Sequence, residues 1–367
     1  MSAYACADPR LPPVKRVLVT GGAGFVGGNL CVGLAERNPD WTFVALDNLR
    51  RRGSELNLPR LAQAGVAFVH GDVRAPEDLS GLGPVDIVIE CSAEPSVMAG
   101  VTDSPDDVIR SNLFGAFHCL ELARRHDAQL IFLSTSRVYP VAGLEGLRLR
   151  EAETRFELAS DQPLPGASDA GIAEDFPLDG ARTLYGASKL SAEHLITEYI
   201  ATYGLSATVL RCGVLAGPWQ MGKPDQGVFS HWLLSHYFGR SLAYIGYGGS
   251  GKQVRDLLHV DDLLELVEEQ LRHPDHWAGT TFNVGGGRAG SLSLLETTAL
   301  CRELTGRRVP VRPQPERRAG DVPVYLTDRR RLFAHTEWRP SRGPEAVLSD
   351  LLGWITEHGQ QLRAVLR

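Results

Sequence analysis

Short apolar runs recur along the first part of the chain, and amphipathic stretches separate them. The runs read RVLVT, TFVALD, VAFVH, DIVIEC, QLIFLS and ATVLRC, at residues 16–20, 42–47, 66–70, 86–91, 129–134 and 207–212. The stretches between them, such as 25–37 and 112–126, have a helical pattern. Continuous Val, Ile and Leu runs that alternate with helices indicate a parallel sheet covered on both faces. The predicted fold class is therefore α/β, with a doubly wound, mostly parallel sheet that binds ligands at the carboxyl ends of its strands.

This rhythm breaks twice. Residues 140–182 are rich in Pro, Gly, Asp and Glu and predict a long irregular insertion, a kind of segment that is usually functional. After Cys212 the pattern is irregular again, up to a strand-like TFNVGG that ends at Gly286. The predicted division is a dinucleotide-binding domain at 14–212, to which 253–285 returns, a smaller substrate-binding lobe at 213–252 and 286–367, and a disordered start at 1–13.

A glycine-rich turn follows the first predicted strand. Gly21, Gly24 and Gly27 are spaced G-x-x-G-x-x-G in GGAGFVGG, where a strand ends and a helix begins. Such glycines permit a tight turn and let backbone N–H groups approach a pyrophosphate at the helix N-terminus. Asp47 ends the second strand, where a carboxylate can bind both hydroxyls of a ribose. Together these residues predict a Rossmann-type dinucleotide site, whereas the alternative is a turn without a ligand.

The acid at the second strand also bears on the choice of cofactor. A 2′-phosphate would meet the Asp47 carboxylate, which favours NAD over NADP. The run Arg50-Arg51-Arg52 points the other way if its side chains hold that phosphate, and the alternative for this run is a solvated loop. Asp72 in HGDV and Ala93 in CSAEP end the third and fourth strands and are further candidates. The cofactor-binding residues predicted are Gly21, Gly24, Phe25, Val26, Gly27, Asp47, Asn48, Asp72, Val73, Ala93, Asn112, Tyr185 and Lys189.

The stretch TLYGASK places a phenol and an ammonium one helical turn apart. Tyr185 and Lys189 share a helix face at i,i+4, with only Gly186, Ala187 and Ser188 between them. A free phenol has a pKa of about 10, and a neighbouring ammonium favours the phenolate and lowers that pKa. The tyrosine is then able to take a proton from a sugar hydroxyl while a hydride leaves the same carbon. The pair is predicted to be a catalytic base and the group that tunes it.

A hydroxyl at the end of the fifth strand is expected as a third catalytic group. LSTSRVYP offers Ser134, Thr135 and Ser136 there, and the alternative is that these residues only end a strand.

Composition narrows the class of protein. The chain has 367 residues and a formal net charge of −6, which argues against a nucleic-acid binder with a basic face. No run of about 18 apolar residues is present, and residues 1–13 lack the pattern of a signal peptide. The six cysteines lie far apart without a CxxC pair, which predicts free thiols and a cytoplasmic location. His70, His118 and His259 have no ligand spacing, so no metal is expected.

The motifs together resemble one family. TGGAGFVG, HGDV, LSTSRVY, YGASK and QVRDLLHVDDL make the chain similar to extended short-chain dehydrogenases/reductases of the NAD-dependent epimerase/dehydratase group. The resemblance implies that Thr135, Tyr185 and Lys189 are catalytic and that NAD is the cofactor. It also implies that Arg255 binds the diphosphate of a nucleotide sugar, a task that suits a planar, permanently charged guanidinium. The alternative for Arg255 is a salt bridge to Asp256 or Asp261.

A narrower resemblance concerns the substrate. DNLRRRGSELN, FPLDGARTLYGASK, QMGKPDQG and GKQVRD are similar to the corresponding loops of CDP-paratose (CDP-tyvelose) 2-epimerases. This implies oxidation at C2 of a CDP-linked deoxysugar and a substrate-binding role for Gln220, Asp225, Gln226 and Arg255. Cys212 is expected near the nicotinamide as a packed thiol. Three further substrate-binding candidates, whose roles stay open, are Glu94, Ser136 and Arg137.

The same resemblance separates candidate reactions. Dehydratases of the family carry Asp-Glu directly after the catalytic threonine, and this chain has Ser136 and Arg137 there, which disfavours dehydration. An NAD-dependent nucleotide-sugar epimerase is therefore the predicted function. The alternatives are a UDP-hexose 4-epimerase, a 4-keto reductase and a non-catalytic NAD(H)-binding sensor. By analogy with relatives, a homodimer is expected, with no nucleic-acid or membrane partner.

Overall fold

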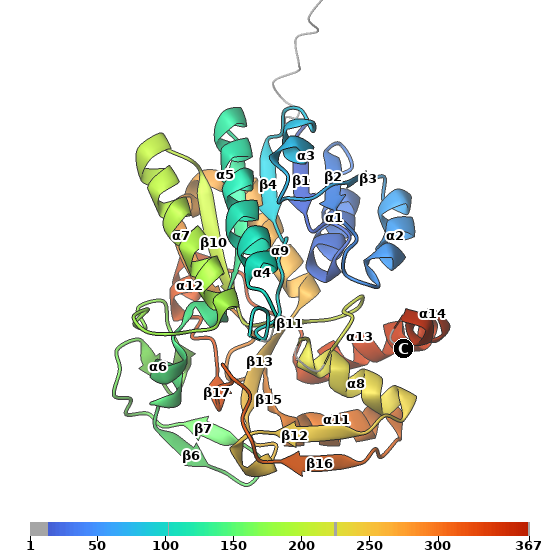
Figure 1. Ribbon diagram of the computed structural model, residues 1–367, viewed down its shortest axis with the longest axis vertical. Helices are drawn as coiled ribbons and strands as arrows, with labels where there is room; N and C mark the ends of the chain where they lie inside the picture. Colours follow the sequence, from blue (N-terminus) through green and yellow to red (C-terminus); the bar gives the residue numbers. More distant parts are fainter. Residues whose placement is uncertain (1–13, 102, 224–225, 366–367) are drawn as a thin grey trace, which may run out of the picture.

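The first domain is built on a sheet of seven parallel strands (Figure 1). The computed structural model describes residues 14–101, 103–223 and 226–365, so the predictions for 1–13 and for Asp225 lie outside the described residues. The strand order is β14-β10-β5-β4-β1-β2-β3, which confirms the doubly wound α/β class. The strand bounds are β1 Arg16–Thr20, β2 Thr42–Asp47, β3 Ala67–His70, β4 Ile87–Glu90, β5 Gln129–Thr135, β10 Ala207–Cys212 and β14 Thr280–Val284.

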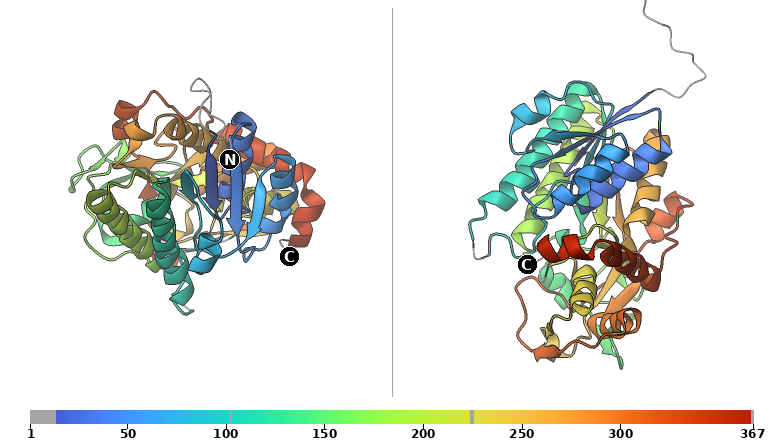
Figure 2. Two further views of the ribbon diagram at one scale, coloured as in Figure 1. Left: turned by 90° about the horizontal axis from the view of Figure 1, so that it is seen from above. Right: turned by 90° about the vertical axis from the view of Figure 1, so that its right-hand side faces the viewer.

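Helices cover both faces of this sheet (Figure 2). Side chains alternate along each strand, so Val17 and Val19 of β1 join the core under α1 and α9, whereas Leu18 joins the core under α5 and α7. Both sets are fully buried, which explains why the strands read as continuous apolar runs. The helices are α1 Phe25–Arg37, α2 Leu58–Gln63 and α9 Val260–Arg272 on one face, and α3 Pro76–Ser80, α5 Gly115–His126 and α7 Leu184–Tyr203 on the other.

A second lobe lies at the carboxyl ends of these strands (Figure 1). The chain enters it directly after β10, and β11 (Val214–Ala216), β13 (Val254–His259), β15 (Ser291–Ser293) and β17 (Val324–Tyr325) form its sheet. Of the segment 253–285, α9 and β14 therefore join the first domain, whereas β13 stays in the second lobe. The other elements of this lobe are β12 Leu242–Ile245, β16 Val311–Gln314, α8 Val228–Phe238, α11 Leu294–Thr305, α13 Pro344–Glu357 and α14 Gly359–Val365.

The stretch predicted as irregular contains short ordered elements. These are α6 Val141–Glu145, β6 Leu149–Glu151, β7 Phe156–Leu158, β8 Ala167–Ser168 and β9 Gly171–Ile172. Strands of two or three residues carry no readable periodicity, which is why the sequence did not show them. Ile172 and Phe176 are buried against Val324 and Tyr325 of β17. We therefore propose that this insertion be counted with the second lobe.

The helix expected at 112–126 has an irregular start. A π-helix, η2 (Arg110–Phe114), joins α4 (Asp106–Ile109) to α5. Such single wide turns occur mostly at functional sites, and here the turn presents the buried Asn112. The remaining short elements are η1 Ser54–Asn57, η3 Ser136–Val138, η4 Tyr247–Gly249, α10 Pro274–Trp277 and α12 Arg330–His335. Within the described residues, no helix combines the length and apolar character needed to cross a membrane.

Candidate active site

The glycine-rich turn lies where β1 passes into α1. Gly21 has a φ of 63°, a backbone conformation that favours glycine, and a Cβ on Gly27 would lie 2.2 Å from the Gly21 carbonyl oxygen. Helix α1 begins after Gly24 without a capping side chain and without an acid in its first turn, which contains Phe25 and Val26. The N–H groups and the positive end of the helix dipole thus remain available to an anion. This turn fits a pyrophosphate.

Asp47 lies beside this turn at the end of β2. Its Oδ2 accepts a hydrogen bond of 3.1 Å from the Ala23 N–H, and its Oδ1 accepts one of 2.8 Å from the Leu49 N–H. Each carboxylate oxygen can accept a second bond, so the group fits a ribose diol. Burial raises the pKa of Asp47, and the backbone N–H groups of Leu49 and Ala23 counteract that rise.

The three arginines after β2 are turned to other partners. Arg50 forms a salt bridge of 2.5 Å with Asp107, and Arg52 donates a bond of 2.8 Å to the Ala364 carbonyl. Arg51 donates to the Met221 carbonyl at 2.9 Å and to the Gln226 side chain. The arginine run thus ties the loop to α4 and to the second lobe, which leaves the Asp47 carboxylate as the group beside the ribose position.

The ends of β2 and β3 form one polar cluster. Asn48 donates a bond of 2.9 Å from its Nδ2 to Asp72, and Arg74 pairs with the same carboxylate at 2.6 Å. Burial alone would raise the pKa of Asp72, but the hydrogen bonds from Arg74 and Asn48 outweigh it and bring that pKa to about 2. The side chain of Val73 is buried in the core, so only its backbone is open to an adenine.

A buried amide holds the loop after β4. The Asn112 Oδ1 accepts a bond of 2.8 Å from the Glu94 N–H, and its Nδ2 donates to the Glu94 carbonyl and to the Ser188 hydroxyl, both at 3.1 Å. Asn112 therefore connects the loop that contains Ala93 with helix α7. Its contribution to the cofactor site is the position of this loop.

The proposed catalytic groups meet at the start of α7. Thr183 caps this helix, its hydroxyl accepting a 3.2 Å bond from the Gly186 N–H, so Tyr185 and Lys189 fall in the first two turns. A Cβ on Gly186 would lie 2.0 Å from the Arg137 carbonyl oxygen. This close approach brings Tyr185 within hydrogen-bond reach of Thr135, the last residue of β5. Glycine is thus needed in TLYGASK for packing against η3.

The electrostatics of the phenol combine opposing effects. Burial raises the pKa of Tyr185, whereas the Lys189 ammonium and the Thr135 hydroxyl lower it without cancelling the rise. Lys189 is itself 2% exposed and forms a salt bridge of 3.0 Å with Glu90, the last residue of β4. Glu90 was missed from sequence, although one acid that ends the apolar run IVIE is a readable signal.

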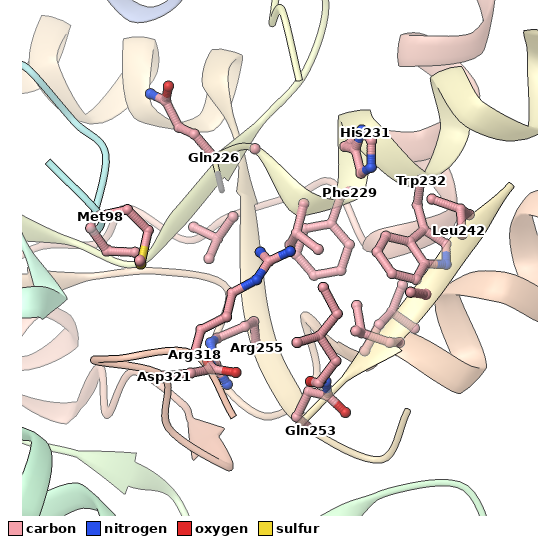
Figure 3. Close-up of a pocket in the computed structure, with 18 of the residues that line it drawn as sticks. Met98, Gln226, Phe229, His231, Trp232, Leu242, Gln253, Arg255, Arg318 and Asp321 are labelled. Carbon is pink, nitrogen blue, oxygen red and sulfur yellow. The ribbon is translucent and has the colours of Figure 1, made fainter. Parts of the chain in front are cut away.

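A cavity of about 460 Å³ opens in the second lobe, on the side where loops of the first domain approach it (Figure 3). Of the predicted substrate residues, Arg137, Gln226 and Arg255 line it. One part of its wall is apolar and aromatic, from Phe229, Trp232 and Leu242. The cavity thus joins a basic region to an apolar one, which is the pattern expected for a nucleotide.

Arg255 does not use either acid considered as its partner from sequence. Its Nη2 pairs with Asp321 at 2.6 Å, and Asp256 instead accepts the backbone N–H groups of Gly287 and Thr327. Arg137 donates a 2.9 Å bond to the Gly320 carbonyl, and Arg318 reaches into the same cavity (Figure 3). The charged run ERRAGD at 316–321 is the signal that could have pointed to Arg318 and Asp321.

Other predicted substrate residues lie apart from this cavity wall. Gln220 donates a bond of 2.8 Å to the Leu215 carbonyl, and its oxygen accepts from the Ser230 hydroxyl, so its amide holds the loop before α8. Glu94 and Ser136 do not line the cavity either. They follow β4 and β5, in the loop after β4 and in η3.

Fold and site together define a dinucleotide-dependent enzyme with a Tyr-x-x-x-Lys pair. Residues 17–285 match the NAD dependent epimerase/dehydratase family, and the chain belongs to this family. It is 29% identical over 359 residues to the CDP-paratose 2-epimerase of Salmonella typhi, covering 93% of this chain and 99% of the relative. It is 27% identical over 336 residues to the UDP-glucose 4-epimerase of Corynebacterium glutamicum, covering 89% and 91%.

Solved structures agree with this assignment. The UDP-glucose 4-epimerase of Thermus thermophilus, in complex with NAD, superposes with a TM-score of 0.74 at 27% identity, covering 93% of this chain and 99% of that chain. The protein is thus an enzyme of the NAD-dependent epimerase/dehydratase family, and the predictions of the family, the enzyme class and the cofactor are confirmed.

Proposed function

We propose that this enzyme inverts C2 of a CDP-linked deoxyhexose. The observation that carries the proposal is the full-length similarity to a CDP-paratose 2-epimerase, together with the four loops noted in the sequence. Two of these loops supply Gln226 and Arg255 to the cavity wall. The similarity therefore includes residues that line the cavity.

The chain's own part in the reaction is proton transfer. Tyr185 takes the proton of the sugar hydroxyl on its Oη and returns it after the other face of the carbon has been reduced. Thr135 orients the phenol and the sugar hydroxyl, and Lys189 favours the phenolate. The glycine turn and Asp47 would hold NAD, which would supply a hydride acceptor for the oxidation and a hydride donor for the re-reduction of this carbon.

Two parts of the cavity wall would bind two different parts of the substrate. Arg137, Arg255 and Arg318 offer planar cations to a diphosphate. Phe229 and Trp232 offer aromatic surface to the nucleoside. The sugar then extends toward Tyr185, which is close enough to Arg137 to counteract part of the fall that burial causes in the pKa of that guanidinium. This arrangement fits a nucleoside diphosphate sugar that lies across both lobes.

Dehydration fits this site poorly. Elimination of water needs an acid and a base beside the catalytic threonine. Ser136 follows Thr135, and the next residue, Arg137, directs its guanidinium into the cavity wall. A cation there serves anion binding, so epimerisation remains the reaction that the residues support.

A second candidate is 4-epimerisation of a UDP-hexose. It is favoured by the relatives from Corynebacterium glutamicum and Thermus thermophilus, both UDP-glucose 4-epimerases. The deciding experiment offers the purified enzyme CDP-paratose, CDP-tyvelose, UDP-glucose and UDP-galactose, each with deuterium at C2 or at C4. Transient transfer of deuterium from C2 of the CDP-sugars to the cofactor supports the proposal. Transfer from C4 of a UDP-hexose would replace it with the second candidate.

We further propose that the enzyme acts in the cytoplasm as a homodimer. Phe114 at the end of η2, Phe117 in α5 and Leu184 at the start of α7 are exposed, and helices α5 and α7 are in contact. A patch of this kind on adjacent helices fits a self-complementary interface. Light scattering after size exclusion should give a dimer, and Phe117→Glu should give a monomer. A monomeric parent protein would contradict this proposal.

A further inference from the structure

One acidic side chain is buried at the centre of the large sheet. Glu90 ends β4, is 1% exposed and lies in register with Thr20 of β1 and Phe132 of β5. Strands β1 and β4 are the neighbours between which the strand order reverses, where doubly wound sheets bind their ligands. The carboxylate therefore lies at the floor of the catalytic region.

Its partner is the catalytic ammonium. Glu90 Oε2 lies 3.0 Å from Lys189 Nζ, and the same Nζ lies 4.2 Å from the centre of the Phe132 ring. Carboxylate and ring thus hold the cation from two sides. Glu90 Oε1 has no hydrogen-bond partner within the described residues.

Such a pair is costly to bury. Removing two charges from water carries a desolvation penalty that their attraction only partly offsets, and apolar residues often replace such pairs without loss of stability. The rest of β4, Ile87, Val88 and Ile89, is apolar and fully buried. The acid at the end of β4 is therefore better explained by an effect on Lys189 than by a contribution to the stability of the sheet.

We propose that Glu90 is a positioning residue, which fixes the Lys189 ammonium beneath the cofactor site and weakens its pull on the Tyr185 phenol. A carboxylate next to the cation offsets part of the positive charge that the phenolate would otherwise meet. In its absence, the pair formed by Tyr185 and Lys189 would release its proton at lower pH. Glu90 thus helps to set the pH at which Tyr185 loses its proton.

The other ionisable groups around this pair leave the argument intact. Burial raises the pKa of the surrounding thiols far enough that they stay neutral, and these are Cys91 after β4, Cys119 on α5 and Cys212 on β10. Arg137 in η3 is a cation that favours the phenolate and is unchanged by any substitution at Glu90. The groups whose charge is in question are therefore Glu90, Lys189 and Tyr185.

Glu90→Gln tests this inference because it removes the charge and keeps the shape. We expect the acid limb of the pH profile of kcat to move to lower pH by about one unit, with a lower plateau because Lys189 is held less firmly. An absorbance titration without cofactor follows ionisation of Tyr185, whose signal is assigned as the one missing from Tyr185→Phe. In Glu90→Gln this signal should shift to lower pH by the same amount. The inference would be overturned if Glu90→Gln lowered the plateau of kcat while the acid limb and the tyrosinate titration stayed at the parental pH. Glu90 would then have only a structural role.

A matched control lies on the same helix as Lys189. Glu193 is also buried, four residues after Lys189 on α7, and its ion-pair partner is Arg211 at 2.7 Å. Glu193→Gln should lower stability and leave the limb in place, whereas a shift as large as that of Glu90→Gln would overturn the specific role. If Glu90→Gln does not fold, Glu90→Asp keeps the charge and should lower kcat without moving the limb; a limb shifted to lower pH in that variant contradicts the inference.

The inference rests on the proposed role of Tyr185 as the base, and the experiments separate the two. An active Tyr185→Phe variant would remove the proposed function. An inactive Tyr185→Phe variant together with a Glu90→Gln profile like that of the parent would remove only the inference about Glu90.

Discussion

Arg255 and Asp321 form an ion pair with 2.6 Å between Nη2 and Oδ1 at the wall of the cavity in the second lobe. The two residues come from β13 and from the loop before β17, and both line the cavity. Arg255 also donates to the carbonyls of Val254 and Val322, at 2.7 and 2.6 Å. The guanidinium is thus fixed in place before an anion arrives, which reduces the entropy lost on binding.

Removing this guanidinium should weaken substrate binding more than turnover. We expect Arg255→Ala to raise KM by about 10- to 100-fold, the value of a charged hydrogen bond, with a much smaller change in kcat. Steady-state kinetics and calorimetry with the free nucleoside diphosphate measure the effect. Arg288→Ala, at an exposed ion pair outside the cavity, is the control. An unchanged affinity for the nucleoside diphosphate would rule out the diphosphate role.

Loss of the phenol should stop the chemistry and spare the cofactor. Tyr185→Phe is expected to lower kcat by about 10²- to 10⁴-fold because one proton-transfer group is lost. NAD should remain bound, because the glycine turn and Asp47 are untouched, and calorimetry with NAD checks this. Tyr203→Phe, near the exposed end of the same helix, should behave like the parent. Near-normal turnover of Tyr185→Phe would contradict the assignment of the base.

The hydroxyl of Thr135 should set the pH range of activity together with Lys189. Its hydrogen bond lowers the pKa of Tyr185, which burial has raised. The base works when deprotonated, so kcat/KM falls as the pH drops through this pKa. Thr135→Val removes the bond, raises the pKa further and should move the acid limb to higher pH by about one unit. Thr135→Ser keeps the hydroxyl and should keep the limb, whereas a valine variant with the parental limb would refute the role.

Two glycines should respond in opposite ways to the same substitution. Gly27→Ala places a Cβ 2.2 Å from the Gly21 carbonyl oxygen, so we expect about 1–3 kcal/mol of destabilisation and weaker NAD binding. Gly353 lies inside α13 with open space around its Cβ position, and Gly353→Ala should stabilise the protein by about 0.5–1 kcal/mol. Urea unfolding and NAD calorimetry measure both. A Gly27→Ala variant with parental stability would show that the turn relaxes freely.

The strands of the large sheet could be predicted from sequence almost to the residue. RVLVT, TFVALD and ATVLRC coincide with β1, β2 and β10, because strands buried on both faces must be apolar throughout. Helix α1 was also predicted with its full extent, 25–37, since a glycine turn fixes its start. The insertion could not be predicted in this way, because its strands of two or three residues depend on pairing with each other and on contacts with distant residues, among them Val324 and Tyr325 of β17.

The candidate site residues also differ in how far the sequence could predict them. Tyr185, Lys189 and the glycine turn could be proposed as site residues because local spacing on a helix or in a turn defines them. The sequence analysis missed Glu90, Arg318 and Asp321. The acid that ends IVIE and the charged run at 316–321 mark these residues, but their partners are far away in the chain and are set only by the fold. Gln220, by contrast, was predicted from a motif to bind substrate, but its amide forms hydrogen bonds with Leu215 and Ser230 of the protein itself.

By itself, the sequence determined the α/β class and predicted the cofactor turn and the Tyr185–Lys189 pair, because periodicity and short-range spacing encode all three. Only the tertiary structure decided that Lys189 would be paired with a buried acid and that Arg255 would be held by Asp321. The physical reason is that the energy of a charge depends on its surroundings, and burial and distant partners exist only once the chain has folded.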